Sequence, residues 1–516
     1  GRTVVFAHTV GPTCLGDTYV TANTVPNILF EVVAGGALAS LVVPVLAGPL
    51  ARGDRDHAGR TASALLSWAL LVSLPLTAVG LLLARPLVGL LAGAGSQGCT
   101  RHDELVIGTR MLLVFMPQVL FYALCIVLTG VLQAHRRFLA PAVGPLLSSV
   151  VVIGAYLLFG AQHPSSNLAQ VSLRAQLILS IGTTLGVVAL ALPLLVPVSR
   201  LHLRLRPTLR FPEAVGRQVA TLAVAGAVTL AAQQLSVAVA VRLAHRGDAG
   251  TLVLYNLAWT VFLVPWAVLA VPVATSAFPL LAARAEERDS VAFASVAASA
   301  LRIVVASAFV AAAVLAATAV PVARVLALRV PGNGDTAALA LTLAAFAPGL
   351  VGYGLVACAG RALYARQSWR PAAVSICLGW VAVVVADVVL VTAFDARWRV
   401  VALGIGNSIG MTVAGGALLY ALAREAGPSA LAGLRRTGPA AFAGAVVGFA
   451  AGGALSRELG RQLGDGSVSG AVVVSILAAV VAGASSIAVW LLCEPHQQRA
   501  LLWHQLGGMR RRIADG

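Results

Sequence analysis

The chain contains no lysine, and charged residues of any kind are scarce. Only 11% of the 516 residues are Asp, Glu, Lys or Arg, and all 36 basic residues are arginine. A soluble protein needs far more polar side chains to cover its folded surface, so the composition excludes a soluble globular class. The formal charge of +17 does not indicate a nucleic-acid partner, because the arginines lie between apolar runs and form no single basic patch.

Sequence motifs of enzymes and metal sites are also missing. The chain has no Walker A loop, no HExxH pair, no GxSxG with a plausible triad, and no paired carboxylates in one apolar run. We therefore expect a protein that is not an enzyme and has no cofactor. Most of the cysteines lie in apolar runs and none form a CxxC pair, so we interpret them as small packing residues without a disulfide or metal role. They are Cys14, Cys99, Cys125, Cys358, Cys377 and Cys493.

Long apolar segments fill the chain from end to end. The sequence is 59% hydrophobic, with a mean hydropathy of +0.91, and runs of 18 or more apolar residues have the length that crosses a bilayer. They predict an all-α polytopic membrane protein with about fourteen helices. The first, ending near Gly11, is expected to be the second half of a helix and not a signal peptide. The others cover about 18–50, 62–83, 105–134, 138–159, 175–198, 219–243, 252–283, 291–319, 337–364, 372–394, 401–423, 440–455 and 468–493.

The arginines concentrate in every second loop between these runs. The pairs Arg136–Arg137 and Arg435–Arg436, the segment 199–217 and the tail 494–516 all fall on one side of the predicted membrane topology. Positively charged loops remain in the cytoplasm during insertion. The pattern therefore places the N- and C-termini in the cytoplasm.

Two loops in different halves of the chain resemble each other. Gly130 and Pro141–Ala142 are spaced like Gly360 and Pro371–Ala372, with Arg136 and Arg366 at the same offset. Val43–Pro44 and Phe278–Pro279 form a second matched pair upstream. Chance is the alternative to duplication, but two matched landmarks favour two pseudo-symmetric six-helix lobes around a cavity. The predicted organisation is an N-lobe at 1–198, a basic linker at 199–217, a C-lobe at 218–424, two extra helices at 437–493 and a basic tail at 494–516.

Polar side chains inside the apolar runs are the candidate site residues, since burying them in hydrocarbon is costly. Asn23, Asn27 and Glu31 lie at i, i+4 and i+8 and so share one helix face, next to Pro26, which should kink the helix. The functional interpretation is a hydrophilic cavity; the alternative is hydrogen bonding between helices, or, for Arg302, snorkelling to an interface. The remaining candidates are Arg2, Asp17, Gln233, Gln234, Asn256 and Thr260.

The segment from Asp17 through Pro26–Asn27, Gly35–Gly36 and Ser40 to Val43–Pro44 resembles the second helix of the MurJ/MviN family of flippases for lipid-linked peptidoglycan precursors. The loops Gly130–Pro145 and Leu363–Gln367 resemble corresponding loops of that family. The resemblance extends over essentially the whole chain. It implies a membrane transporter of the multidrug/oligosaccharidyl-lipid/polysaccharide exporter superfamily in the bacterial plasma membrane, which moves lipid II from the inner to the outer leaflet by alternating access.

The resemblance also implies partners and a substrate site. The expected partners are a polyprenyl pyrophosphate-linked saccharide, membrane lipids and, as further candidates, cell-wall synthesis proteins, with coupling to the membrane potential or to a monovalent cation. Arg2 would be the main positive charge for the pyrophosphate, because the family's other cavity arginines correspond to Phe30 and Thr260 here. Two alternatives stay open: a cation-coupled drug exporter of the same superfamily, and a non-transporting scaffold for cell-wall assembly.

Overall fold

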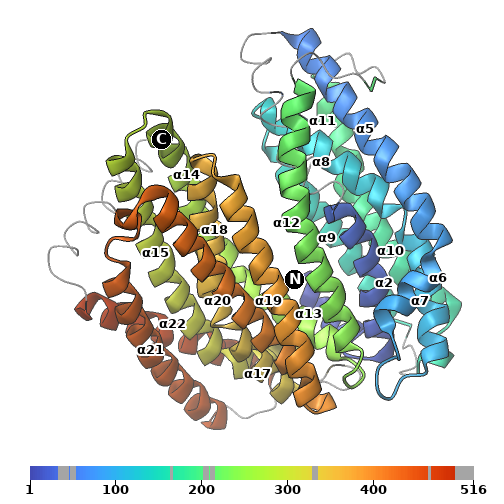
Figure 1. The fold of residues 1–516 in the computed structure, drawn as a ribbon. Coiled ribbons are helices and arrows are strands. Elements are labelled where there is room, and N and C mark those ends of the chain that lie inside the picture. Colours follow the sequence, from blue (N-terminus) through green and yellow to red (C-terminus); the bar gives the residue numbers. More distant parts are fainter. Residues whose placement is uncertain are drawn as a thin grey trace. The chain divides into compact units, whose positions relative to one another are not determined.

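The computed structural model describes residues 1–32, 46, 54–162, 167–201, 208–209, 215–327, 330, 335–462 and 467–493. Apart from one isolated β-bridge between Gln97 and Asp248, all regular elements in these ranges are helices, which confirms the predicted all-α class (Figure 1). Several sequence predictions fall outside the described residues: the Gly35–Pro44 part of the second helix, most of the linker 199–217 and the tail 494–516.

The number of membrane-spanning helices is close to the prediction. Eleven described helices are long and apolar enough to cross a bilayer, or twelve if the bent pair α17 (Thr336–Phe346) and α18 (Gly349–Ala365) is one span. The helices α1 (Arg2–Thr9) and α2 (Cys14–Phe30) are too short in their described part to enter this count.

Several helix boundaries follow the predicted apolar runs closely. The predicted runs 138–159, 291–319, 372–394 and 468–493 correspond to α9, α15, α19 and α22. Their bounds are α9 (Leu139–Gly160), α15 (Ser290–Ala317), α19 (Trp369–Ala393) and α22 (Val468–Cys493), and the other long helices are α5 (Arg55–Leu82), α10 (Leu173–Ala191), α12 (Val215–Ala244), α20 (Arg399–Ala426) and α21 (Leu434–Gln462).

Four predicted spans are interrupted, among them the run 337–364, which forms α17 and α18. The run 105–134 forms α7 (Arg101–Phe115) and α8 (Gln118–Ala134), and the break falls at Pro117, which lacks the amide that a continuous helix needs. The run 252–283 forms α13 (Thr251–Pro265) and α14 (Val271–Glu286), joined by a π-helical turn at Trp266–Ala270. The run 175–198 ends in the short helix α11 (Leu195–Ser199) after α10.

The two halves share more than the loops that the sequence matched. Helix α7 is separated from α8 by a break at the segment Phe115-Met-Pro117. Helix α17 is separated from α18 in the same way, at Phe346-Ala-Pro348. The short helices α6 (Ala84–Ala92) and α16 (Ala319–Ala327) follow α5 and α15 in corresponding places. Equivalent breaks in equivalent helices support a duplicated ancestor.

The chain forms two compact units. Unit 1 comprises Gly1–Leu257, Arg329–Asp335 and Asp387–Leu403, and unit 2 comprises Ala258–Leu328, Thr336–Ala386 and Gly404–Gly516. Within unit 1, α2 packs against α7, α9 against α10, and α5 against α8. Within unit 2, α15 is central and packs against α14, α18, α21 and α22. The division into lobes at 1–198 and 218–424 stays a prediction.

Small residues join the last two helices. Gly444 and Gly448 of α21 face α22 so closely that an added Cβ would lie 2.5 Å from the Ser486 carbonyl and 2.4 Å from the Ala482 carbonyl, respectively. Close backbone approach through glycine is the usual means of membrane helix association. The face of α21 that carries Gly444 and Gly448 is therefore covered by α22.

We predict that Gly448→Ala lowers the thermal unfolding temperature of the detergent-solubilised protein, because the added methyl group must displace α22. Overpacking of this kind typically costs about 1–3 kcal/mol. Gly453→Ala is the matched control: it lies in the same helix with open space at the Cβ position, so alanine should leave the temperature unchanged or raise it slightly. Equal unfolding temperatures for the two variants would contradict the proposed packing.

Candidate functional site

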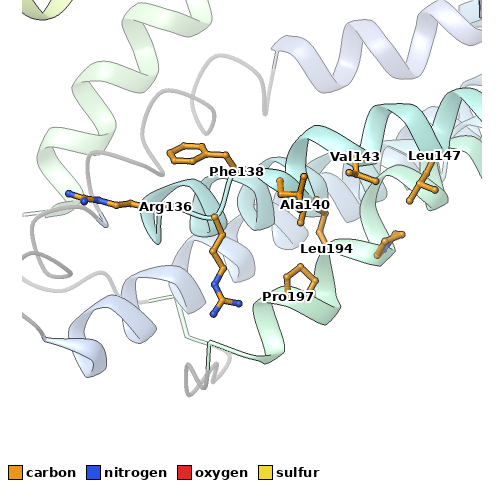
Figure 2. A pocket seen from close by; sticks show the side chains of 11 residues that line it. Arg136, Phe138, Ala140, Val143, Leu147, Leu194 and Pro197 are labelled. Carbon is orange, nitrogen blue, oxygen red and sulfur yellow. The ribbon is translucent and has the colours of Figure 1, made fainter. Parts of the chain in front are cut away.

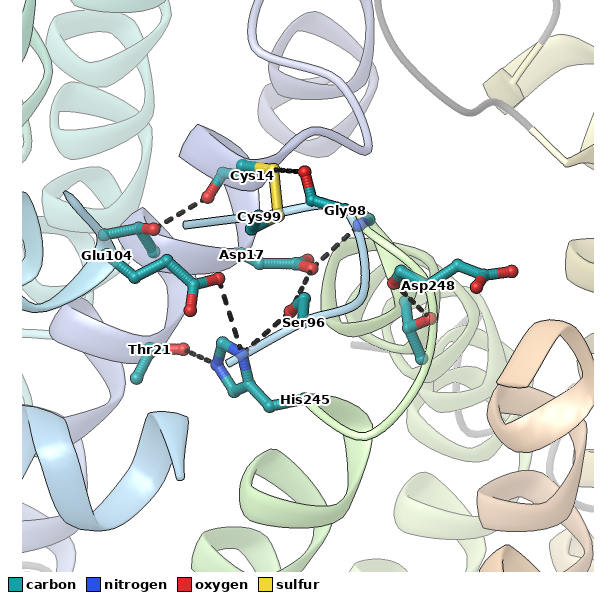
Figure 3. Close-up of polar contacts among 12 residues, drawn as sticks. Cys14, Asp17, Thr21, Ser96, Gly98, Cys99, Glu104, His245 and Asp248 are labelled. Atoms are coloured by element: carbon teal, nitrogen blue, oxygen red, sulfur yellow. Dashed lines mark hydrogen bonds and ion pairs between the residues drawn. A yellow bond between two sulfur atoms is a disulfide. The ribbon is translucent and has the colours of Figure 1, made fainter. Parts of the chain in front are cut away.

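Asp17 lies at the start of α2 and caps a helix that is distant in sequence (Figure 3). Its Oδ2 accepts a hydrogen bond from the Gly250 amide at 2.8 Å, and its Oδ1 accepts one from the Val253 amide at 3.0 Å. These amides form the N-terminal turn of α13, which carries unpaired donors and a positive dipole end. The side chain of Asp17 is 0% exposed, so this cap is a buried, charge-assisted contact between α2 and α13.

His245 connects the same region through a second set of contacts. One ring nitrogen, Nδ1, lies 2.9 Å from Ser96 Oγ, and the other, Nε2, lies 2.7 Å from Thr21 Oγ1. Ser96 also donates to Asp17 Oδ2 at 3.4 Å. We call Asp17, Thr21, Ser96, Glu104 and His245 the Asp17 cluster; all five are buried. Burial together with the positive charge of Arg242 lowers the pKa of His245 to about 4.

Two loops meet beside this cluster. The Gln97 amide donates to the Gly247 carbonyl, and the Ala249 amide donates to the Gln97 carbonyl, both at 3.0 Å. The α6–α7 loop is therefore paired with the loop between α12 and α13. Gly250 must be glycine here, because its φ of +91° is left-handed and an added Cβ would lie 2.5 Å from the Pro12 carbonyl.

A disulfide between Cys14 and Cys99 ties the start of α2 to the α6–α7 loop. The sequence-based interpretation of these two cysteines as packing residues is therefore wrong. It failed because they lie 85 residues apart and have no recognisable spacing. Ser96 and Gln97 shortly precede Cys99, so the bond restrains the loop that supplies Ser96 to the cluster and Gln97 to the pairing of the two loops.

Arg2 lies in another part of unit 1, next to an aromatic group. Its charge acts on Tyr19, Tyr122 and Tyr156. The Tyr19 hydroxyl lies 2.9 Å from the Tyr156 hydroxyl and 2.6 Å from Thr183 Oγ1. Arg2 itself is exposed. The sequence search did not identify these tyrosines, because aromatic residues in apolar runs ordinarily pack in the core.

The other candidates on α2 lie away from Asp17. Asn23, Asn27 and Glu31 are half-buried towards the far end of the helix, and about 20 Å of helix separates Glu31 from Asp17. Asn27 Nδ2 donates to the Asn23 carbonyl at 2.9 Å, so its amide is used within the helix. Phe30 stacks on Tyr122 with ring centroids 4.9 Å apart. The structure thus divides the α2 candidates between two places.

The remaining candidates lie on α12 and α13. Gln234 is buried and Gln233 half-buried on α12, and Asn256 is exposed on α13, all in unit 1. Thr260 is half-buried in the part of α13 that belongs to unit 2. Their contribution to a substrate site stays a prediction. Within the described ranges, no group of three His, Cys, Asp or Glu side chains could hold a metal ion.

A pocket of about 630 Å³ lies at the start of α9, where the matched loop Gly130–Pro141 ends. Figure 2 shows Val143 and Leu147 along one side, Leu194 and Pro197 along the other, and Arg136 at one end. The pocket thus combines apolar side chains with two arginines, a lining that suits an amphipathic molecule. None of the candidate residues predicted from sequence lines it.

Comparisons with known proteins agree on one family. The family model described as "Lipid II flippase MurJ" matches residues 6–455. The lipid II flippase MurJ of Burkholderia cenocepacia is 30% identical over 168 residues, which is 31% of this chain and 31% of that protein. The chain thus aligns with about a third of the length of this curated relative.

Two solved structures resemble the fold. The structure described as lipid II flippase MurJ in an inward closed conformation has a TM-score of 0.71 and 17% identity, covering 97% of this chain and 96% of its own. An inward-facing transporter of the multidrug resistance MATE family has a TM-score of 0.67 and 15% identity, covering 82% of this chain and 93% of its own. At these identities the likeness shows the fold alone.

We predict that Asp17→Ala frees the first turn of α13. Each lost charge-assisted hydrogen bond is worth about 1.5–3 kcal/mol, so amide exchange at Gly250 and Val253 should accelerate by more than about tenfold. Asp289→Ala is the matched control, because Asp289 caps α15 through the Ala292 amide at 2.9 Å in unit 2. Unchanged exchange at Gly250 and Val253 in Asp17→Ala would refute the cap.

We also predict that non-reducing peptide mapping of the purified protein recovers Cys14 linked to Cys99. Replacing both by serine should destabilise unit 1 by about 2–4 kcal/mol, the usual contribution of a disulfide closing a loop of this kind, as measured by thermal unfolding. Cys493→Ser, which alters an exposed free thiol, should have no effect. Recovery of both cysteines as free thiols would contradict the assignment.

Proposed function

Because the chain belongs to the lipid II flippase MurJ family, we propose that it moves lipid II from the inner to the outer leaflet of the bacterial plasma membrane by alternating access. The observation that carries the proposal is the match to this family model over residues 6–455, in a chain with eleven or twelve apolar helices long enough to span a bilayer. Flipping needs a cavity that opens to each side in turn, and paired loops at one end of the helices provide a contact that can close one side.

We further propose that the Asp17 cluster lies on the outer side, with both termini in the cytoplasm. The arginine distribution favours this orientation. The Cys14–Cys99 disulfide supports it independently, because disulfides persist in oxidising compartments outside the cytoplasm. In the described conformation the α6–α7 loop and the α12–α13 loop are paired, so this end of unit 1 is closed.

The proposed substrate contact is Arg2 with the pyrophosphate of the lipid-linked saccharide, with Asn27 as a neutral donor. A dianionic group entering a cavity of low dielectric constant needs a fixed positive charge, and Arg2 is exposed and near three tyrosine hydroxyls. Coupling to the membrane potential or a monovalent cation and contacts with cell-wall synthesis proteins remain part of the proposal.

Length favours a flippase over the drug exporter alternative. The MATE transporter fold accounts for 82% of the chain, whereas the MurJ fold accounts for 97%. Helices α21 and α22, which pack on α15, correspond to the two helices predicted beyond the two six-helix lobes. The experiment that follows also tests the alternative that the chain is a non-transporting scaffold.

We predict that the purified chain in proteoliposomes accelerates the exposure of fluorescent lipid II to an external enzyme or quencher. Arg2→Ala should reduce this rate by about tenfold or more, and Arg2→Lys should restore part of it, since lysine keeps the charge but loses the bidentate geometry. Arg85→Ala is the control, because Arg85 is an exposed arginine on α6, distant in the sequence from the candidate residues.

The outcomes separate the alternatives. Flipping by the wild-type chain with full activity in Arg2→Ala would refute the role of Arg2 but keep the proposed function. Export of a cationic drug without movement of lipid II would favour the exporter, and movement of neither would favour the scaffold.

A further inference from the structure

Glu104 is a buried carboxyl group that the capping of α13 does not explain. It lies in the first turn of α7 and is 1% exposed. Among the described residues, neither carboxylate oxygen has a hydrogen-bond partner. Its nearest basic neighbour is His245, whose Nδ1 lies 3.9 Å from Glu104 Oε1. Buried carboxylates normally accept hydrogen bonds from donors, so the protonation state of Glu104 has to be explained.

The surroundings do not supply a compensating charge. Asp17 on α2 is close enough to repel a negative charge on Glu104, and it already uses the amide donors of α13. Arg242 on α12 acts on His245, and its guanidinium lies against Gly93. Other charged residues of the adjoining elements are Arg101, His102 and Asp103 on α7, and Arg246 and Asp248 in the α12–α13 loop. None of these forms an ion pair with Glu104 in the described structure.

The two carboxyl groups therefore differ in their chemistry. Burial disfavours the charged form of Asp17, and the two backbone hydrogen bonds that it accepts at a helix N-terminus offset part of that cost. The donors near Glu104 are the amide and hydroxyl groups of Ser96, and neither has hydrogen-bond geometry to its oxygens in the described structure. An unpaired charge in this setting would cost several kcal/mol. Two interacting groups such as Glu104 and His245 titrate as a pair, and the pair avoids a lone buried charge by holding one proton.

We propose that Glu104 and His245 form a proton-binding site that is occupied when the two loops are paired and the outer end of unit 1 is closed. When the loops pair, the site takes one proton from the external aqueous phase, and when they separate, water reaches Glu104 and the proton returns to the same phase. No other bond is made or broken. That the proton comes from the external side rests on the orientation proposed above. Occupancy of the site by a proton does not depend on which lipid is moved.

The sign of the pH effect follows from the two groups. Raising the external pH removes the proton from the pair and leaves a buried charge, which weakens closure. Lowering the pH also weakens closure. The pKa of His245 is about 4 in the closed form and about 6.5 when the ring is hydrated. Acid therefore favours the form in which the loops are separated and His245 is protonated. The paired loops should be most stable between these limits.

The experiment is infrared spectroscopy of the purified, substrate-free chain in lipid. A protonated buried carboxyl group absorbs in the carbonyl region of carboxylic acids, where ionised carboxylates do not. Asp387 is a second buried carboxyl group with an unpartnered oxygen, so the band is read from the difference between spectra. At neutral pH we expect the wild-type spectrum minus the Glu104→Gln spectrum to contain a carboxylic-acid band. Glu287→Gln is the matched control, because Glu287 is exposed and paired with Arg284, and it should keep the band.

A second variant links the proton to closure. In Asp17→Ala the first turn of α13 is released, so Glu104 should become hydrated and lose its band at a pH well below that needed in the wild type. A difference spectrum of wild type and Glu104→Gln without a carboxylic-acid band, or a titration of that band that is the same in Asp17→Ala and the wild type, would overturn the proposal. Because no substrate is present, either result is independent of whether the chain flips lipid II.

Discussion

The contact between the Asp17 carboxylate and the first turn of α13 determines the arrangement of one end of unit 1. A buried carboxylate requires donors, and the Gly250 and Val253 amides supply two. This requirement places the start of α2 against the start of α13, with Gly16 so close to Val253 that a Cβ would meet its side chain at 2.8 Å. The pairing of the loops at Gln97 and the contacts of His245 occur at the same place, because the cap brings both loops together.

Much of the fold could be predicted from the apolar runs, since their length alone identifies membrane helices. The breaks were less visible, although Pro117 and Pro348 were present in the sequence at matched positions. A proline inside a long apolar run does not show in the hydropathy, because hydropathy reflects the free energy of transfer into lipid and not the loss of a backbone hydrogen bond. The π-helical turn at Trp266–Ala270 has no comparable compositional signal.

The candidate site was only partly predictable. Asp17 was identified because a carboxylate in an apolar run is costly, but its partner amides lie 233 and 236 residues away, and backbone donors leave no trace in side-chain patterns. Glu104 and His245 were missed because each lies at the edge of an apolar run, where a polar residue ordinarily faces water. Cys14 and Cys99 were misinterpreted because they lie 85 residues apart in the sequence and only the fold brings them together.

The contact between the paired loops is polar in composition, which affects how readily it could open. The two amide hydrogen bonds that Asp17 accepts are worth about 1.5–3 kcal/mol each, because water can replace the amide donors when the contact opens. The disulfide ties the α6–α7 loop to the start of α2, whereas the α12–α13 loop has no such covalent link among the described residues. An apolar contact of the same area would be harder to separate, because it would expose hydrocarbon to water. A polar, capped and covalently braced contact can therefore be specific in the closed state without being permanent.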